Sequence, residues 1–199
     1  MSDDLFETMY RGAEGDAAAI PWAALSPNPF MADWLHGHSG PGEAVVVGCG
    51  LGDDAEAAAA QGWDVTAFDV APSAIEWCKE RFPGSSVAYS TQDLFDLPPH
   101  WTGSFSLVVE VLTVQSLEPS LQQEAIRRIA ELVAPEGTLL VFTFGHDGSG
   151  ERTGPPWPPA RPDLETFLAA GLDQVTFTTR PSRWPDYMLI EAEYFRPPA

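Results

Sequence analysis

A short glycine-rich segment between two apolar strands carries the clearest chemical signal in the chain. An apolar strand reaches Val47 and then breaks into the sequence GCGLG at 48–52. Alternating glycines let backbone N–H groups approach a ligand that any side chain would hold away. Asp69 closes the next apolar strand, where its carboxylate is placed to accept both hydroxyls of a ribose. The segment and Asp69 together predict a site for a nucleoside cofactor.

The residues after the glycines favour one such cofactor over another. The dinucleotide pattern GxGxxG has its third glycine where this chain has Asp53, and Asp54 comes next. Two carboxylates at a helix start would repel a pyrophosphate and attract the positive charges of a sulfonium and a free amino group. One of them can cap the helix while the other faces the ligand. We therefore expect S-adenosylmethionine in preference to NAD.

Charge and composition exclude several classes of partner. The 199 residues carry a formal net charge of −19, from 10 basic and 29 acidic residues, which would repel nucleic acid. A hydrophobic fraction of 44% and 2 cysteines are typical of a globular protein of the reducing cytoplasm. The N-terminus lacks the pattern of a signal peptide, and no stretch approaches the roughly 18 apolar residues of a membrane span. We expect a cytoplasmic monomer or homodimer that acts on a small molecule.

Strands and helices alternate around the glycine-rich segment. Two helical pieces, Asp3–Arg11 and one containing Phe30–Leu35, precede the first strand. The expected elements then follow in this order: strand Ala44–Val47, helix Asp54–Gln61, strand Asp64–Phe68, helix Pro72–Arg81, strand Ser86–Tyr89, strand Phe105–Val109, helix Pro119–Val133 and strand Thr138–Phe144, the last two joined by a turn at 135–137. Such alternation predicts a parallel sheet.

The C-terminal part should end the sheet in the opposite direction. A helix over Asp163–Ala170 is followed by two strand-like runs, Gln174–Thr179 and Tyr187–Phe195. The gap between these runs is too short for a parallel crossover, so they are expected to form an antiparallel hairpin. The length suits one domain over 1–199, with a helical lid segment at 1–40 and a sheet core at 41–199.

Four segments, at 47–52, 67–75, 92–94 and 132–140, together resemble the class I S-adenosylmethionine-dependent methyltransferases. The resemblance covers Trp22–Phe195 and implies a Rossmann-like α/β fold with seven strands, mostly parallel, ending in an antiparallel hairpin. Segments at 20–22, 52–54 and 154–156 are similar to the thiol and thiopurine methyltransferase branch. The chain departs from the family in having Val46 where a carboxylate often precedes the first glycine, and Ser106 where an aspartate often opens the fourth strand.

The resemblance implies which residues bind the cofactor. The expected set is Gly48, Cys49, Gly50, Gly52, Asp54, Asp69, Val70, Asp93, Leu94 and Glu110. Asp93 would accept the adenine amino group, and Leu94 would supply a backbone N–H. Each carboxylate has a structural alternative: Asp69 as a helix N-cap, Asp93 as a turn former and Glu110 as an ordinary solvated strand-end residue.

Aromatic and histidine side chains complete the candidates. Trp22 and Trp157 are expected to bind the substrate, with core packing as the alternative for Trp22 and a peptide-recognition segment as the alternative for Trp157. His146 is a candidate general base, or simply a loop residue. His36 and His38 are spaced like metal ligands, but no cysteine or carboxylate cluster accompanies them, so we expect no metal.

These residues predict methyl transfer to a small nucleophile. A sulfonium methyl group is already activated, so the protein mainly aligns the reactants and excludes water. A thiol with a pKa near or below roughly 8.5 is partly ionised at neutral pH and needs little help from a base. We therefore expect a thiol or heteroaromatic sulfur as the acceptor, with O- or N-methylation of a small metabolite as the alternative. An NAD(P)-dependent oxidoreductase and a non-catalytic cofactor-binding domain are the remaining alternatives.

Overall fold

The computed structural model describes residues 4–148, 154–184 and 186–199. Two compact units make up the chain, Met1–Asp96 and Leu97–Ala199. The first contains the glycine-rich segment, and the second contains the antiparallel C-terminal strands. A single domain over 1–199 stays a prediction. Among the helices of the described residues, none is both long enough and apolar enough to cross a membrane.

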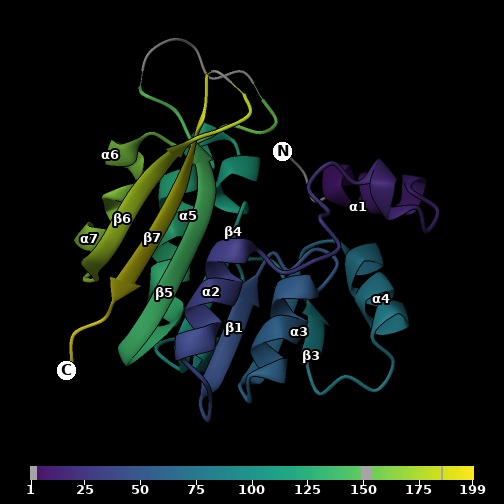
Figure 1. The fold of residues 1–199 in the computed structure, drawn as a ribbon, viewed down its shortest axis with the longest axis horizontal. Helices are drawn as coiled ribbons and strands as arrows, with labels where there is room; N and C mark the ends of the chain where they lie inside the picture. Colours follow the sequence, from purple (N-terminus) through teal and green to yellow (C-terminus); the bar gives the residue numbers. More distant parts are fainter. Residues whose placement is uncertain (1–3, 149–153, 185) are drawn as a thin grey trace. The chain divides into compact units, whose positions relative to one another are not determined.

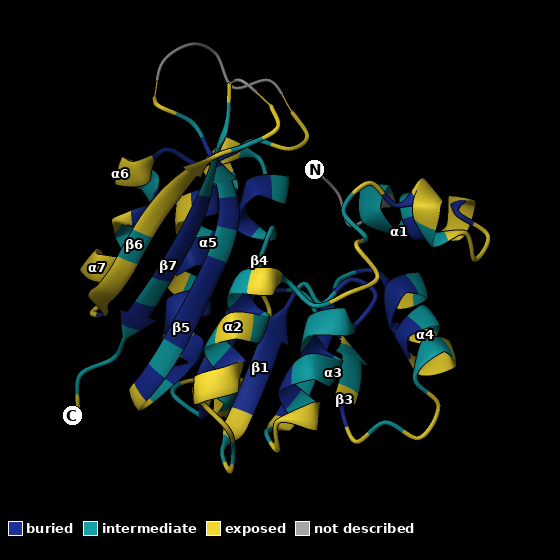
Figure 2. Ribbon diagram, in the orientation of Figure 1, coloured by how far each residue is buried: buried dark blue, intermediate teal, exposed yellow. Residues whose placement is uncertain are grey.

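The first unit is built on a parallel three-stranded arrangement in the order β3-β2-β1 (Figure 1). Its strands are β1 (Glu43–Val47), β2 (Asp64–Asp69) and β3 (Ala88–Thr91), and its helices are α1 (Asp4–Gly12), η1 (Ala17–Ala19), α2 (Pro29–Gly37), α3 (Asp53–Ala60) and α4 (Pro72–Arg81). All of β1 except Glu43 is buried, as expected for a strand covered on both faces (Figure 2).

Local chemistry sets the helix boundaries of this unit. The side chain of Asn28 accepts the Phe30 N–H at 3.0 Å, and Pro29 opens α2. Pro72 opens α4 in the same way, and Gly84 follows its end with a φ of 84°. The bounds predicted for α4 are confirmed. The predicted third strand was two residues too early, because the ladder with β2 begins only where Thr66 pairs with Ala88.

The second unit combines one parallel and two antiparallel strand pairs in the order β4-β5-β7-β6. Its strands are β4 (Phe105–Val111), β5 (Val133–Gly145), β6 (Asp173–Pro181) and β7 (Met188–Phe195), and its helices are η2 (Pro99–Trp101), η3 (Val114–Ser116), α5 (Pro119–Leu132), α6 (Arg161–Leu164) and α7 (Thr166–Ala169). Figure 2 shows β5 and β7 largely buried or partly buried, whereas the edge strand β6 is almost entirely exposed. The predicted fold class, with seven strands and an antiparallel C-terminal pair, is confirmed.

Two details of this unit differ from the prediction. The expected turn at 135–137 lies inside β5, because pairing with β4 already begins at Val133 and the extra residues form an irregularity where Glu136 has a φ of 61°. The expected helix over 163–170 is split into α6 and α7. Glu165, with a ψ of −13°, interrupts the regular helical hydrogen bonding between α6 and α7. Gly171 ends the segment with a φ of 85°.

Candidate functional site

The glycine-rich segment forms a turn that requires glycine at three positions. Gly48, Gly50 and Gly52 have φ angles of 58°, 53° and 88°, in the left-handed region that side chains disfavour. The Cys49 N–H donates to the Phe68 carbonyl at 2.9 Å, which holds the turn beside the end of β2. A hydrogen bond with Cys78 and burial raise the pKa of the Cys49 thiol well above its ordinary value. Contact of Cys49 with the cofactor stays a prediction.

Asp69 lies at the end of β2, directly beside this turn. Its Oδ2 accepts the Gly50 N–H and its Oδ1 accepts the Ala71 N–H, each at 3.0 Å, and the residue is only 7% exposed. Burial raises the pKa of Asp69, while the backbone N–H groups of Ala71 and Gly50 oppose the shift. Each carboxylate oxygen retains a further lone pair for a ribose hydroxyl. The alternative of a helix N-cap is wrong, because that position is Ala71.

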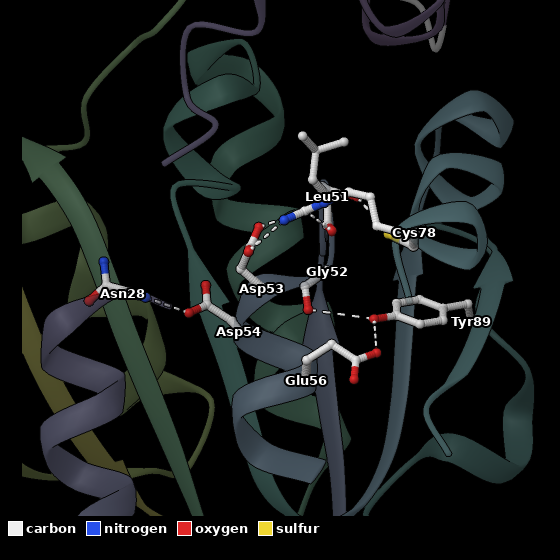
Figure 3. A network of polar contacts seen from close by, with 10 residues as sticks. Asn28, Leu51, Gly52, Asp53, Asp54, Glu56, Cys78 and Tyr89 are labelled. Atoms are coloured by element: carbon white, nitrogen blue, oxygen red, sulfur yellow. Dashed lines mark hydrogen bonds and ion pairs between the residues drawn. The ribbon is translucent and has the colours of Figure 1, made fainter. Parts of the chain in front are cut away.

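Asp53 does not face a ligand as an uncompensated charge. Arg81, near the end of α4, donates to both of its carboxylate oxygens at 2.8 Å and also to the Leu51 carbonyl (Figure 3). Asp53 thus neutralises the guanidinium that anchors the loop. The expectation that both carboxylates at the start of α3 are free to attract a cationic cofactor is therefore wrong for Asp53.

Asp54 is tied to the segment that precedes β1. Its Oδ1 accepts the Asn28 N–H at 2.7 Å (Figure 3). Burial raises the pKa of Asp54 to about 6, the Asn28 N–H opposes this shift, and the charge of Asp53 adds to it. The N-cap of α3 is Gly52, which has no side chain to offer. Contact of Asp54 with the cofactor stays a prediction.

The side chains of Tyr89 and Cys78 form a second set of contacts with the glycine turn. The Tyr89 hydroxyl donates to Glu56 Oε1 at 2.8 Å and lies 3.5 Å from the Gly52 carbonyl, while Cys78 Sγ donates to the Gly50 carbonyl at 3.1 Å (Figure 3). With Arg81, these residues fix the loop to α3, α4 and β3. The family often has a carboxylate at the position of Val46, and the apolar Val46 side chain cannot form such polar contacts with the loop. Tyr89, Cys78 and Arg81 form polar contacts with the loop instead, and no sequence pattern pointed to them.

The N-terminal segment covers the same turn. The Trp22 indole N–H donates to the Tyr10 hydroxyl at 2.8 Å, and Tyr10 is only 4% exposed. A Cβ on Gly50 would lie 3.2 Å from that hydroxyl oxygen, so α1 approaches the loop closely. Glu7 accepts both the N–H and the hydroxyl of Ser73, at 3.0 and 2.7 Å, and caps the start of α4. Trp22 is therefore at the turn, half-buried, and its contact with a substrate stays a prediction.

The remaining candidates of the first unit lie on the connections after β2 and β3. Val70 is half-buried directly after Asp69, and Leu94 is 8% exposed. Asp93 Oδ1 accepts the Phe95 N–H at 2.8 Å, so Asp93 does form the turn that was its structural alternative. Adenine recognition by Asp93 and Leu94 stays a prediction.

Glu110 lies at the end of β4 in the second unit and is fully buried, so the solvated alternative is wrong. Its Oε1 accepts the N–H groups of Thr113 and Val114 at 2.6 and 2.9 Å, which fixes the start of η3. Its Oε2 has no hydrogen-bond partner among the described residues. Burial raises the pKa of Glu110 to about 7, against the two N–H groups, which lower it. A role in cofactor binding stays a prediction.

The titration of Glu110 should make stability depend on pH. Its folded-state pKa lies above its ordinary value of 4.5, so the folded protein favours the protonated carboxyl. The associated stabilisation is complete below the unfolded-state pKa and is lost as the pH rises through about 7. We expect the Glu110 contribution to fall by about 2 kcal/mol between about pH 5 and pH 8. Urea unfolding across that range should show a flatter pH dependence for Glu110→Gln, which retains the acceptor oxygen. The exposed Glu43→Gln variant should follow the wild type, and a wild-type slope in Glu110→Gln would contradict the assignment.

The backbone of Trp157 is held on both sides. Its N–H donates to the Gln115 carbonyl at 2.6 Å, and its carbonyl accepts from Gln122 Nε2 at 2.7 Å. Gln115 Oε1 also accepts from Thr143 Oγ1 and from the Phe144 N–H, at 3.0 and 2.6 Å. Two buried glutamines thus position the half-buried Trp157, and a glutamine in a sequence gives no signal of such a role. Substrate contact by Trp157 stays a prediction.

The three candidate histidines, His36, His38 and His146, have backbone partners. His146 Nδ1 accepts the Gly148 N–H at 2.9 Å, and a neutral imidazole that accepts at Nδ1 carries its proton on Nε2. This arrangement does not favour His146 as a base. His36 and His38 each place Nδ1 within 2.8 Å of a carbonyl one turn earlier in α2. Within the described ranges, no three His, Cys, Asp or Glu side chains cluster as metal ligands, and the lack of a metal stays a prediction.

The known proteins and the family model that this chain resembles are methyltransferases. A family described as "Methyltransferase domain" matches residues 44–137, which include the glycine turn and Asp69. The chain is 29% identical over 159 residues to "Probable thiol methyltransferase 2" of Arabidopsis thaliana, covering 77% of this chain and 68% of that protein. It is 24% identical over 170 residues to "2-heptyl-1-hydroxyquinolin-4(1H)-one methyltransferase" of Mycobacteroides abscessus, covering 83% and 75%.

Solved structures agree on the fold. The 1,6-didemethyltoxoflavin-N1-methyltransferase of Burkholderia thailandensis, solved with S-adenosylhomocysteine, has a TM-score of 0.74 at 20% identity, covering 98% of this chain and 87% of that chain. The glycine turn and the buried strand-end carboxylate fit an adenosyl cofactor, and these likenesses confirm S-adenosylmethionine rather than NAD. The individual contact residues stay predictions.

Proposed function

Because the chain belongs to the class I S-adenosylmethionine-dependent methyltransferases, we propose that it methylates the sulfur of a small thiol or heteroaromatic compound. The observation that carries the choice of sulfur is the likeness to the probable thiol methyltransferase. Thiols also suit the side chains found here. His146 Nδ1 is engaged with a backbone N–H, and a partly ionised thiol reacts without a base.

The glycine turn and Asp69 are the proposed holding groups for the cofactor. Bound S-adenosylmethionine supplies a methyl group on a sulfonium. Asp69 would accept the ribose hydroxyls on the lone pairs not used by Gly50 and Ala71. Arg81, Tyr89 and Cys78 would keep the loop in the conformation that admits the cofactor.

Trp22 and Trp157 are the proposed acceptor-binding residues. An aromatic face next to a sulfonium offers a cation–π contact and excludes water. The two hydrogen bonds that hold the Trp157 backbone reduce the ordering cost of binding.

Methylation of oxygen or nitrogen is the second candidate. The relative from Mycobacteroides abscessus is named for a 1-hydroxyquinolinone, and the Burkholderia thailandensis structure is of an N1-methyltransferase. Both of those acceptors are heteroaromatic, so this alternative shares the acceptor shape with the first and differs in the attacking atom.

A panel of acceptors should separate these possibilities. We expect S-adenosylhomocysteine to be released fastest with an aromatic thiol, and more slowly with the phenol and the amine of the same ring, because only the thiol is largely ionised near neutral pH. The measurement is product formation by mass spectrometry, with protein lacking acceptor as the control. Fastest turnover of the phenol or the amine would replace sulfur with oxygen or nitrogen. Calorimetric binding of S-adenosylhomocysteine without any turnover would indicate a non-catalytic binding protein.

A further inference from the structure

The carboxylate of Asp69 is held by hydrogen bonds from two different segments. Its Oδ2 accepts the Gly50 N–H and its Oδ1 accepts the Ala71 N–H, each at 3.0 Å. Gly50 belongs to the glycine turn, and Ala71 lies on the short connection from β2 to α4. The direction in which the carboxylate points therefore depends on the position of both segments.

One helix, α1, contacts both of these segments. An added Cβ on Gly50 would lie 3.2 Å from the Tyr10 hydroxyl oxygen, so Tyr10 lies against the glycine turn. Glu7 accepts the N–H and the hydroxyl of Ser73, at 3.0 and 2.7 Å, and Ser73 comes shortly after Ala71 in the chain. Residues three apart lie on one side of a helix. The same side of α1 therefore reaches the two segments that hold the carboxylate.

The hydrogen bonds to Ser73 are stronger than the ion pair that Glu7 also makes. Arg11 approaches Glu7 only to 3.9 Å, and the Arg11 side chain is 73% exposed. Exposed ion pairs of this kind contribute little to stability. Apolar packing holds α1 in the same place, because Tyr10 belongs to a buried cluster that includes Ala71. Glu7 is therefore a fixed hydrogen-bond acceptor on a packed helix.

The charge of Glu7 cannot explain a favourable effect on Asp69. Burial raises the pKa of Asp69, and the negative charge of Glu7 raises it further. Both effects disfavour the ionised carboxylate, which is the form that accepts hydrogen bonds from ribose hydroxyls most strongly. A benefit of Glu7 to cofactor binding must therefore come from its hydrogen bonds, which hold the backbone, and not from its charge.

We propose that Glu7 is a positioning residue for the cofactor site. Its hydrogen bonds fix Ser73, and with it the connection that presents the Ala71 N–H, so that Asp69 is aimed at the ribose before the cofactor arrives. The inference rests on the contact between Asp69 and the ribose that is part of the proposed function. Through Glu7, α1 contributes to cofactor affinity although this side chain does not contact the cofactor.

Calorimetric titration of S-adenosylhomocysteine into variants of Glu7 tests this role. We expect Glu7→Ala to weaken binding about tenfold, because the connection after β2 loses both of its hydrogen bonds to α1. Glu7→Gln retains an oxygen that accepts the Ser73 N–H and gains an amide that can donate to the hydroxyl, so it should bind within about twofold of wild type. The matched control is Glu76→Ala, which removes the same charge from an exposed position of α4 and should also stay within about twofold of wild type.

A double-mutant cycle separates positioning from a general loss of stability. In protein that already carries Asp69→Ala, the further change Glu7→Ala should alter binding by less than about twofold, because the group that Glu7 positions is absent. A merely structural effect would weaken binding by the same factor with and without Asp69. An equal factor in the two backgrounds would overturn this inference, as would wild-type binding by Glu7→Ala, or binding by Glu7→Gln as weak as that of Glu7→Ala.

These measurements need no methyl acceptor, so they are independent of the choice of sulfur, which the panel of acceptors tests. Weak binding by Asp69→Ala together with wild-type binding by Glu7→Ala removes the role of Glu7 and leaves the proposed function intact. A dependence on Glu7 that disappears in the Asp69→Ala background supports this inference even if no sulfur compound is methylated.

Discussion

Replacement of Asp69 with alanine is expected to weaken binding of S-adenosylhomocysteine by about 2 to 3 kcal/mol, or roughly 30- to 150-fold. The carboxylate has two functions that alanine removes. It would accept the ribose hydroxyls, and it already accepts the N–H groups of Gly50 and Ala71, which shape the glycine turn. Isothermal titration calorimetry measures the effect directly.

A matched control lies on the same strand. Asp64 is the first residue of β2 and Asp69 is the last, so the two lie at opposite ends of the strand. Asp64 is exposed, and Asp64→Ala should therefore bind S-adenosylhomocysteine like the wild type. Asp69→Asn retains one carbonyl oxygen without the charge and should fall between wild type and Asp69→Ala. An unchanged dissociation constant in a folded Asp69→Ala protein would show that the ribose is bound elsewhere.

The sequence allowed good prediction of those elements whose boundaries depend on local chemistry. Pro72 and Gly84 bracket α4, and the bounds predicted from them are those observed. The left-handed turn at Gly48, Gly50 and Gly52 also follows from residue type alone, since few other residues adopt such φ angles. The antiparallel pairing of β6 with β7 follows from the length of the connection.

The charges around the turn could not be assigned in the same way, because their partners are distant in sequence. Asp53 is neutralised by Arg81 from the far end of α4, and Ser73 is capped by Glu7, 66 residues away. An acidic residue in a sequence has the same formal charge whether it is paired or free. Glu110 is a further example: strand position correctly placed it at the end of β4, but its complete burial depends on packing that no local pattern encodes.

The supporting side chains escaped prediction for a related reason. Tyr89, Cys78 and Gln115 lie on ordinary strand, helix and turn positions, and each acts through one or two hydrogen bonds to the backbone of a segment far away in the chain. Sequence periodicity reports which face of an element is apolar. It does not report which polar group on that face meets a particular carbonyl. The functional loop was therefore predictable, whereas the network that holds it was not.

Replacement of Gly52 with alanine should test whether that network leaves any room at the turn. The new Cβ would lie 2.6 Å from the Tyr89 hydroxyl oxygen and 3.1 Å from Cys78 Sγ, at a φ of 88°. The left-handed backbone costs about 1 to 2 kcal/mol and the overlap about 1 to 3 kcal/mol, so we expect the free energy of unfolding to fall by about 3 kcal/mol. Chemical denaturation measures this loss, and calorimetry should show that binding of S-adenosylhomocysteine is lost with it.

The chain offers a control that separates the two causes of this loss. Gly62 also has a φ of 88°, but an added Cβ there meets nothing within 4 Å, so Gly62→Ala should show only the backbone cost of about 1 to 2 kcal/mol. Removing the Tyr89 hydroxyl in Gly52→Ala/Tyr89→Phe should recover part of the difference, although the hydrogen bond to Glu56 is lost as well. If Gly52→Ala were no less stable than Gly62→Ala, the side chains of Tyr89 and Cys78 would have to move freely, and the turn would not be held by the network that contacts it.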